Sequence, residues 1–196
     1  MRRRSPTSSG RPSPGRERSV TWAVVGGRES GSHGDGFRVA VRGPEQTAAV
    51  AGVLARALVP GDAVLLSGDL AAGKTTFVTA AVAALGSEDV VTSPTFTIAN
   101  SYAAPAGPVL HIDTYRLDDV AAFRDLGLEE YLESAIAFVE WGELVAAELA
   151  ELAALLHVHL AAVPENPDGR LVTVRAGAPR WDAALSGLHD EIVGAL

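Results

Sequence analysis

One short segment of the sequence has the residue types and spacing needed to hold phosphate groups. Gly68-Asp-Leu-Ala-Ala-Gly73-Lys74-Thr75 fits the pattern G-x-x-x-x-G-K-[ST] at every fixed position. In such a loop the backbone N–H groups turn inward around phosphate oxygens, and the helix that follows adds the positive end of its dipole. Lys74 would reach the β- and γ-phosphates of a nucleotide, and the Thr75 hydroxyl would contact Mg²⁺. The alternative is that this segment is a glycine-rich turn before a helix that matches the pattern by chance.

Lys74 is the only lysine in the chain, and all the other strongly basic side chains are arginines. An ammonium group is a compact point charge, whereas a guanidinium group is a planar fork. A sequence that uses arginine elsewhere and lysine here indicates that this position needs the compact charge.

Two acidic residues end apolar segments that are typical of buried strands. Asp113 ends Val109–Asp113, and Glu140 ends Ala135–Glu140. Ligands of open α/β sheets collect at the carboxyl ends of the strands, so both acids would face the phosphates. There they could hold Mg²⁺ or orient an attacking water. The alternative for each is an ordinary exposed carboxylate at the end of a strand.

Three histidines lie in expected strands. His111 precedes Asp113 by two residues and so shares its face, but no second histidine lies at ligand spacing. We therefore expect His111 to have a hydrogen-bonded packing role rather than to bind a metal. His157 and His159 fall in a late strand away from the motifs, and we expect them to be structural.

The elements that would position these residues alternate along the chain. We expect strands at 37–42, 63–67, 97–102, 109–113, 135–140, 155–160 and 171–175, and helices at 44–58, 73–85, 120–133 with a break at Gly127, 144–152 and 181–196. This order predicts an α/β, P-loop NTPase-like fold with a mostly parallel central sheet flanked by helices. The last two strands, joined by a loop at 164–169, indicate a hairpin that forms an antiparallel edge.

Composition divides the 196 residues into two parts. Residues 1–35 are rich in Arg, Ser, Pro and Gly and are expected to be a disordered tail, and residues 36–196 are expected to be one P-loop ATPase domain. The chain has no cysteine, which excludes disulfides and a cysteine metal site and is compatible with the cytoplasm, where we expect the protein. No apolar run approaches the length of a membrane span, so no membrane partner is expected.

The net charge of −8 is unevenly distributed, because six arginines and only one acidic residue lie in the first twenty residues. The remainder is therefore even more acidic than the whole. Such a body is not typical of a nucleic-acid binder, and we expect a partner to hold any RNA that is involved.

Four stretches taken together resemble the TsaE family, also called YjeE. They are Gly68–Thr76 (GDLAAGKTT), Ser93–Thr97 (SPTFT), His111–Leu117 (HIDTYRL) and Val139–Trp141 (VEW). P-loops are widespread, but the last three segments in this order are more specific, and the resemblance covers roughly Phe37 to Arg180. It implies a slow ATPase that binds ATP and Mg²⁺. It also implies action with TsaB and TsaD in attaching threonylcarbamoyl to adenosine 37 of tRNAs that read codons beginning with A, with tRNA contacted only through the complex.

The resemblance also implies roles for individual residues. Asp113 would be a Walker B-like acid, Glu140 would hold Mg²⁺ or orient water, and Thr95 would sense the γ-phosphate from a switch-like loop. Trp141 would pack beside the nucleotide, and Arg170 could touch it. The implied metal ligands are Thr75, Asp113 and Glu140, and the implied nucleotide-binding set is Gly68, Ala71, Ala72, Gly73, Lys74, Thr75, Thr76, Thr95 and Trp141.

Ala71 departs from the family loop, which usually has glycine at this position. If the position needs a positive φ, alanine would cost on the order of 1 kcal/mol. We therefore expect a slightly strained loop or weaker nucleotide binding.

Two other functions remain open from the sequence. A small-molecule kinase would share the P-loop, but it usually has a lid with several arginines, and between Leu117 and Ala135 only Arg124 is present. A nucleotide-dependent binding module without catalysis would share all the ligands of a slow ATPase.

Overall fold

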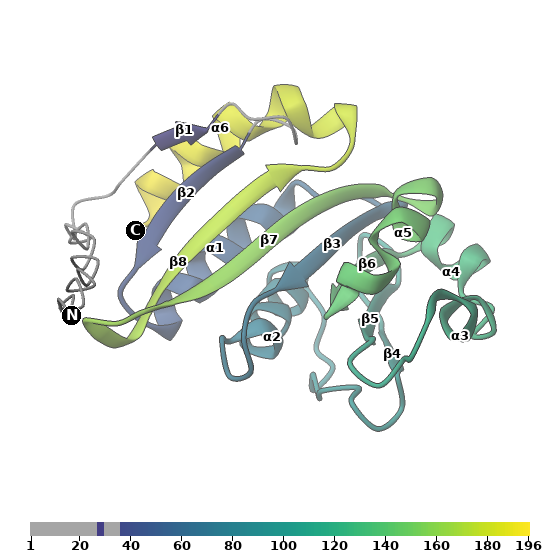
Figure 1. Cartoon of the computed structure of the whole chain (residues 1–196). Coiled ribbons are helices and arrows are strands. Elements are labelled where there is room, and N and C mark those ends of the chain that lie inside the picture. The colour runs from purple at the N-terminus through teal and green to yellow at the C-terminus, as the bar shows by residue number, and fades with distance from the viewer. Residues whose placement is uncertain (1–26, 30–35) are drawn as a thin grey trace, which may run out of the picture.

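The computed structural model describes residues 27–29 and 36–196. The strands of this part are β1 Gly27–Glu29, β2 Gly36–Val41, β3 Asp62–Ser67, β4 Ala99–Tyr102, β5 Val109–Asp113, β6 Ile136–Glu140, β7 Ala154–Val163 and β8 Asn166–Ala176. They form one eight-stranded sheet in the order β1-β2-β8-β7-β3-β6-β5-β4 (Figure 1).

Six α-helices and one short 3₁₀ helix accompany the sheet within the described residues. Their bounds are α1 Pro44–Arg56, α2 Lys74–Ala84, α3 Val120–Arg124, α4 Glu129–Ser134, η1 Gly142–Val145, α5 Ala146–Leu152 and α6 Pro179–Ala195. The predicted break at Gly127 separates α3 from α4, and Gly127 has a φ of 62°. Proline at the start of α1 and of α6 fits a helix N-terminus, where its missing N–H costs nothing.

The predicted fold class is confirmed. At the centre of the sheet β7, β3, β6 and β5 are parallel neighbours, while β4 and the β8, β2 and β1 side are antiparallel. The predicted hairpin, β7–β8, lies on the antiparallel side, but β2 and β1 extend the sheet beyond it, so it is not the outermost pair. A turn at Pro164 and Glu165 joins its strands, because β8 already begins at Asn166 within the loop expected at 164–169.

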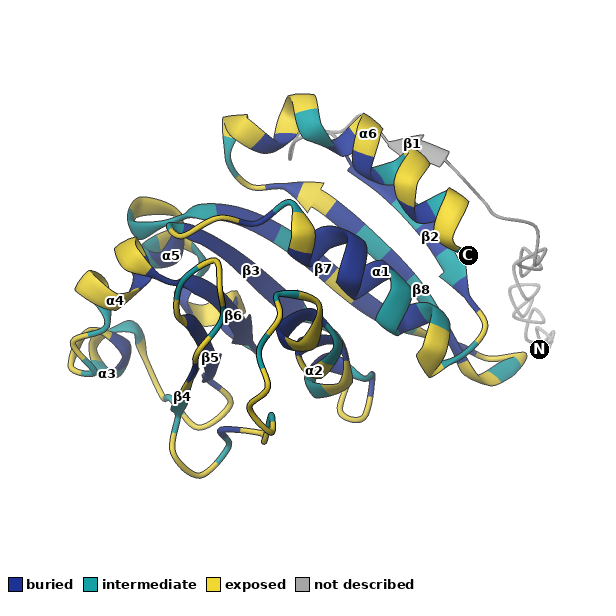
Figure 2. Ribbon diagram, turned by 180° about the vertical axis from the view of Figure 1, so that it is seen from behind, coloured by how far each residue is buried: buried dark blue, intermediate teal, exposed yellow. Residues whose placement is uncertain are grey.

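Helices cover both faces of the sheet, and residues alternate between the two cores. On β3, Val64 and Leu66 join the cluster under α1, α2 and α6, whereas Ala63 and Leu65 join the cluster under α3, α4, η1 and α5. Figure 2 shows the buried strands as a layer behind α1, α2 and α6. This burial on both faces explains why the central strands are nearly continuous apolar runs.

Strand β1 pairs with β2 in antiparallel register, and no strand was predicted there. It lies within residues 1–35, which were predicted to be disordered. The other residues of that range lie outside the described residues, and so does the prediction of disorder for them. In the described part no helix has both the length and the apolar character to cross a membrane.

Candidate functional site

The loop between β3 and α2 has the backbone shape that its glycines allow. Gly68 and Gly73 have φ values of 132° and 101°, and a Cβ on Gly68 would lie 2.3 Å from the carbonyl oxygen of Leu160. Only glycine therefore lets this loop leave β3 close to β7. Ala71 also has a left-handed φ, of 63°, so the position where the sequence departs from the family pattern does require the unfavourable conformation.

Lys74, the first residue of α2, is buried and held over the loop. Its Nζ donates hydrogen bonds to the carbonyl oxygens of Gly68 and Asp69, at 2.8 and 2.9 Å, and lies 3.7 Å from the centre of the Trp141 ring. Burial lowers the pKa of Lys74, while the charges of Glu140, Glu143 and Asp113 act to raise it. The cation thus lies between a ring face and acidic groups.

A cavity of about 450 Å³ opens beside this loop. Its lining includes every residue of the predicted site except Gly68, whose carbonyl group instead binds Lys74. The lining residues are Leu70, Ala71, Ala72, Gly73, Lys74, Thr75, Thr76, Ser93, Thr95, Asp113, Glu140 and Trp141. Segments more than sixty residues apart in the chain therefore meet at one cavity.

The two acids lie side by side because their strands are parallel neighbours. Asp113 at the end of β5 is the register partner of Glu140 at the end of β6, and both side chains are buried. Buried carboxylates are rare unless they are hydrogen-bonded or bind a cation. Both are hydrogen-bonded here, through different partners.

Glu140 bridges the loop and the sheet. Its Oε1 accepts a hydrogen bond from the Thr75 hydroxyl, at 2.8 Å, and lies 3.0 Å from Nε2 of His111. His111 is fully buried, and its Nδ1 has no hydrogen-bond partner. The hydrogen-bonded packing role expected for His111 is therefore confirmed, and its partner is the carboxylate of Glu140 on the neighbouring strand.

Asp113 is held by the loop that precedes β4. Its Oδ2 accepts a hydrogen bond from the hydroxyl of Thr95, at 2.7 Å, and its Oδ1 accepts one from the backbone N–H of Tyr115, at 2.9 Å. Thr95 also bonds to Ser93, at 2.7 Å. The SPTFT segment is therefore tied directly to the acid that was predicted to lie near the metal.

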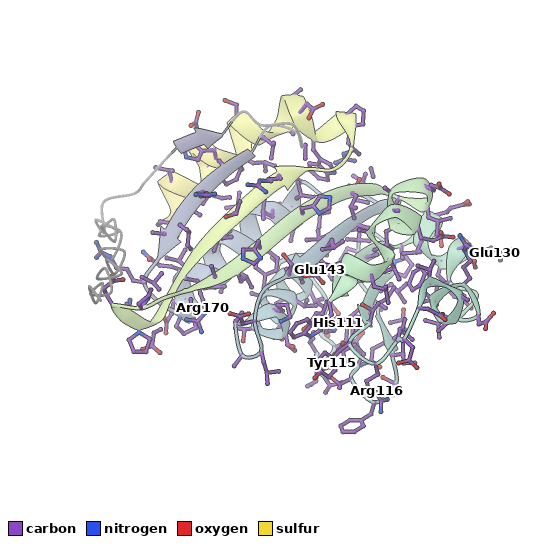
Figure 3. All side chains as sticks on the ribbon, in the orientation of Figure 1. His111, Tyr115, Arg116, Glu130, Glu143 and Arg170 are labelled. Atoms are coloured by element: carbon purple, nitrogen blue, oxygen red, sulfur yellow. The ribbon has the colours of Figure 1, made fainter. Side chains whose placement is uncertain are left out.

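Trp141 follows Glu140 and turns the chain sharply. It has a φ of 60°, and its backbone N–H donates to the carbonyl oxygen of Leu66. The ring of Tyr115 lies 5.2 Å from the Trp141 ring. Figure 3 shows Tyr115 and Arg116 on the same side of the molecule as His111.

Arg170 approaches the loop from β8 rather than from the cavity. Its Nε and a terminal nitrogen donate to the carbonyl oxygens of Ala72 and Ala71, at 2.8 and 3.2 Å. It also borders a second cavity of about 180 Å³, shared with Pro44, Thr47, Asp168 and part of the loop. In Figure 3 it lies toward the β7–β8 turn, away from His111. The structure places Arg170 as a support of the loop backbone, a role with no signal in the sequence.

Arg116 contacts the SPTFT segment rather than the two acids that follow it in the sequence. It donates to the carbonyl oxygen of Phe96, at 3.0 Å, and its guanidinium group lies 5.4 Å from the Phe96 ring. Asp118 and Asp119 are close in sequence, but Asp119 instead caps α3 through the N–H of Ala122.

The donor set suits a hard cation that also binds phosphate. Within the described residues no cluster of three or more His, Asp or Glu side chains is arranged to hold a metal by itself. Mg²⁺ in nucleotide sites is usually bound by one or two protein oxygens together with phosphates and water. Thr75, Glu140 and Asp113 fit that pattern, because all three line the cavity with oxygen atoms.

The chain is similar to known proteins of one family. Residues 41–170 match the family described as "Threonylcarbamoyl adenosine biosynthesis protein TsaE". The tRNA threonylcarbamoyladenosine biosynthesis protein TsaE of Bacillus subtilis is 37% identical over 152 residues, which cover 76% of this chain and 92% of that protein. The protein of the same name from Streptomyces coelicolor is 39% identical over 134 residues, covering 67% and 90%.

A solved structure has the same fold. The crystal structure of Bacillus subtilis YdiB superimposes with a TM-score of 0.65 and 30% identity, covering 79% of this chain and 95% of that chain. Residues 41–170, which match the family model, contain the loop, both strand-end acids and the SPTFT segment.

Proposed function

Because this chain belongs to the TsaE family of tRNA threonylcarbamoyladenosine biosynthesis, we propose that it binds ATP and Mg²⁺ and hydrolyses ATP slowly as an accessory protein of that pathway. One observation carries the proposal. Two buried carboxylates on neighbouring parallel strands open into the same cavity as the lysine and threonine of the phosphate loop. Phosphoryl transfer needs these groups together.

The loop would bind the phosphates of ATP. Its backbone N–H groups and the N-terminus of α2 attract anions, and the buried ammonium group of Lys74 lies among them. Before ATP arrives, the carbonyl oxygens of Gly68 and Asp69 keep Lys74 satisfied. Binding therefore exchanges neutral acceptors for charged phosphate oxygens, which form stronger hydrogen bonds.

Thr75, Glu140 and Asp113 would hold Mg²⁺. Bound Mg²⁺ would neutralise charge on the phosphates. The Thr75 hydroxyl already lies 2.8 Å from Oε1 of Glu140, so the two oxygens are close enough to bind the same ion. The hydrogen bond with His111 keeps the Glu140 carboxylate oriented, and the hydrogen bonds from Tyr115 and Thr95 keep the Asp113 carboxylate oriented.

The acids would also orient the attacking water. A carboxylate that accepts a hydrogen bond from a water molecule positions the oxygen of that water for in-line attack on the γ-phosphate. Thr95 would report on that phosphate, because its hydroxyl is bonded to Asp113 while Ser93, Phe96 and Thr97 of the same segment are exposed. A change at the γ-phosphate would in this way reach the surface of the SPTFT segment.

The partners and the location are part of the proposal. We assign TsaB and TsaD as partners, with tRNA contacted through them, and we place the protein in the cytoplasm with residues 36–196 as its ATPase domain. Membership of the family and the acidic character of the chain support this assignment.

The test is ATP turnover by the full chain, with and without TsaB and TsaD from the same organism. We expect slow turnover that rises with the pair, and we expect Glu140→Gln to lose most turnover while its ATP affinity stays within a few-fold of wild type. Glu151→Gln on the exposed side of α5 is the matched control and should behave as wild type. Transfer of phosphate to a metabolite, or turnover unaffected by Glu140→Gln, would contradict the proposal.

A further inference from the structure

His111 lies next to the site but does not touch the cavity. Its side chain is 0% exposed, and it is not among the residues that line the cavity beside the phosphate loop. Its ring can therefore reach neither a nucleotide nor the water around it. Any effect of His111 on the chemistry has to pass through Glu140, whose Oε1 lies 3.0 Å from Nε2 of the ring.

The surroundings of the two ring nitrogens decide which of them carries the hydrogen. Nε2 faces an oxygen of Glu140, which as a carboxylate can only accept, and Nδ1 is buried without a hydrogen-bond partner among the described residues. A hydrogen on Nδ1 would be unpaired and would turn a lone pair of Nε2 toward the carboxylate. The neutral ring therefore carries its hydrogen on Nε2, and His111 is a donor to Glu140.

Packing alone does not account for a histidine at this position. Phe138, the register partner of His111 on β6, and Tyr102, whose ring lies 6.4 Å away, belong to the apolar core under α1, α2 and α6. An apolar side chain would fill the same space without burying an unpaired nitrogen, which is unfavourable. What the imidazole adds is the hydrogen bond to Glu140.

The two donors beside Glu140 share one of its carboxylate oxygens. Oε1 lies 3.0 Å from Nε2 of His111 and 2.8 Å from the Thr75 hydroxyl. Oε2 accepts no hydrogen bond from a described residue, yet it is not one of the buried atoms that lack a partner. Because Glu140 lines the cavity, Oε2 is the oxygen that is open to it.

The backbone of Glu140 is fixed as well. Its carbonyl oxygen accepts hydrogen bonds from the N–H and the hydroxyl of Thr114, at 3.0 and 3.1 Å. With the backbone held by Thr114 and Oε1 held by His111, the side chain of Glu140 has little freedom to rotate. A reacting group that is already fixed in this way needs no reorganisation when it acts.

Asp113, the other buried acid of the site, is bound differently. Its Oδ1 accepts a hydrogen bond from the N–H of Tyr115, and its Oδ2 accepts one from the Thr95 hydroxyl. Of the oxygens of the two carboxylates, only Oε2 of Glu140 accepts no hydrogen bond from the described part of the chain. A water molecule in the cavity therefore finds its free charged acceptor on Glu140.

We propose that His111 is a positioning residue for ATP hydrolysis, which holds Oε1 of Glu140 so that Oε2 is presented to the attacking water. The inference rests on the proposed ATPase function and narrows it, because it assigns the water to Glu140 rather than to Asp113. The water oxygen bonds to the γ-phosphorus, and the bond from that phosphorus to the bridging oxygen breaks with its electron pair going to ADP. The proton that the water loses passes to Oε2, which releases it to solvent through the cavity.

The experiment compares two amide variants of His111 that are both polar but differ in reach. The amide nitrogen of Gln can occupy the position of Nε2, whereas that of Asn reaches only as far as Nδ1. With saturating ATP, Mg²⁺, TsaB and TsaD, we expect His111→Asn to lower kcat about 10- to 100-fold, as the loss of an outer hydrogen bond does in other sites. His111→Gln should stay within a few-fold of wild type. ATP affinity measured by calorimetry should be nearly unchanged in both variants, because His111 does not line the cavity.

His189→Gln on α6 is the matched control. Nε2 of His189 is also buried without a partner among the described residues, but His189 does not line the cavity and lies on another element. This variant should hydrolyse ATP as wild type does. Urea denaturation of all variants distinguishes positioning from a purely structural role, because kcat should follow the donor at Nε2 and not the free energy of unfolding. Equal kcat in the Gln and Asn variants of His111, or kcat that follows their stability, would overturn the proposal.

A second measurement needs no ATP turnover. Long-range proton–nitrogen NMR of the full chain shows which ring nitrogen carries the hydrogen, and the His111 signals are assigned by their loss in His111→Gln. We expect the hydrogen on Nε2, with a shift of this signal in Glu140→Gln, where the charged acceptor is lost. A hydrogen on Nδ1, or a signal that Glu140→Gln leaves unchanged, would contradict the contact itself. The expected NMR pattern in a wild-type chain that does not hydrolyse ATP would instead overturn the ATPase function, and the positioning role with it.

Discussion

At the scale of single residues, Ala71 carries a measurable backbone cost. It has a φ of 63° in a loop whose other left-handed positions, Gly68 and Gly73, are glycines. The left-handed region costs an L-residue with a Cβ roughly 1–2 kcal/mol. The loop is therefore built with strain that a glycine would remove.

We expect Ala71→Gly to raise the free energy of unfolding by about 0.5–1 kcal/mol, measured by urea denaturation. The gain is smaller than the strain because glycine also gives the unfolded chain more entropy. Ala72→Gly is the matched comparison, since Ala72 is buried and has no left-handed φ, and it should destabilise the protein. Equal effects of the two variants would show that the φ of Ala71 has no energetic consequence.

Local sequence patterns predicted the residues of the site better than their contacts. The loop pattern and the strand-end acids can be recognised from spacing alone, and the structure brings them to one cavity. The bond between His111 and Glu140 could not be predicted in this way, because it depends on which strands are neighbours and in which register. The roles of these residues in binding and turnover stay predictions.

At the scale of elements, β8 supports the phosphate loop through Arg170. Nearly one hundred residues separate Arg170 from Ala71 and Ala72, whose carbonyl groups it binds. Its other guanidinium nitrogen bonds to Pro167 and Gly169 in its own strand, which fixes the side chain. The strand thus limits how far the loop can move.

We expect Arg170→Ala to raise the dissociation constant of ATP about tenfold while the fold is retained, because charged hydrogen bonds to the loop are lost. The measurement is a binding titration with a fluorescent ATP analogue. Arg56→Ala, on the last turn of α1, is the control and should bind as wild type. An affinity unchanged in Arg170→Ala would contradict the supporting role.

The elements themselves were largely predictable, because apolar runs, glycines and prolines mark them locally. The strand predicted at 109–113 is confirmed without change, and Gly127 does separate two helices. The hairpin strands are longer than predicted, because Asn166 pairs with Val163 of β7, past an irregularity in register between Ala162 and Val163, where local composition indicates a loop. Neighbours in the sheet overrode local propensity there.

At the scale of the whole molecule, an ion pair between a buried carboxylate and a partly exposed arginine attaches the C-terminal helix to the central sheet. Asp62 at the start of β3 is 1% exposed and lies 2.9 Å from Arg180 near the start of α6. Arg180 also donates to the carbonyl oxygen of Ala57 after α1. One side chain therefore connects three elements.

We expect Arg180→Ala to lower the free energy of unfolding at pH 7 by about 2–3 kcal/mol, because it leaves a buried carboxylate without its cation. Arg124→Ala, which breaks the exposed pair with Glu148, should cost less than about 1 kcal/mol. Equal losses in the two variants would contradict the role of burial.

The loss should also depend on pH. Burial raises the pKa of Asp62 above 3.8, and Arg180 opposes that rise, so removing Arg180 raises the pKa further. A raised carboxyl pKa means that the ionised form is disfavoured in the folded state and that stability is lost as pH rises through this range. The cost of Arg180→Ala should therefore be largest at pH 7 and decrease as the pH is lowered toward 3.8, as measured by urea denaturation at several pH values.

The most direct test of the account is calorimetric titration of the full chain with ATP and Mg²⁺, in wild type and in Lys74→Ala. The account predicts one saturable site per chain in wild type. It also predicts no detectable binding in Lys74→Ala with an unchanged far-UV circular dichroism spectrum, because the buried ammonium group is the cation of the loop. ATP bound equally well by a folded Lys74→Ala variant would contradict the assignment of this cavity as the nucleotide site.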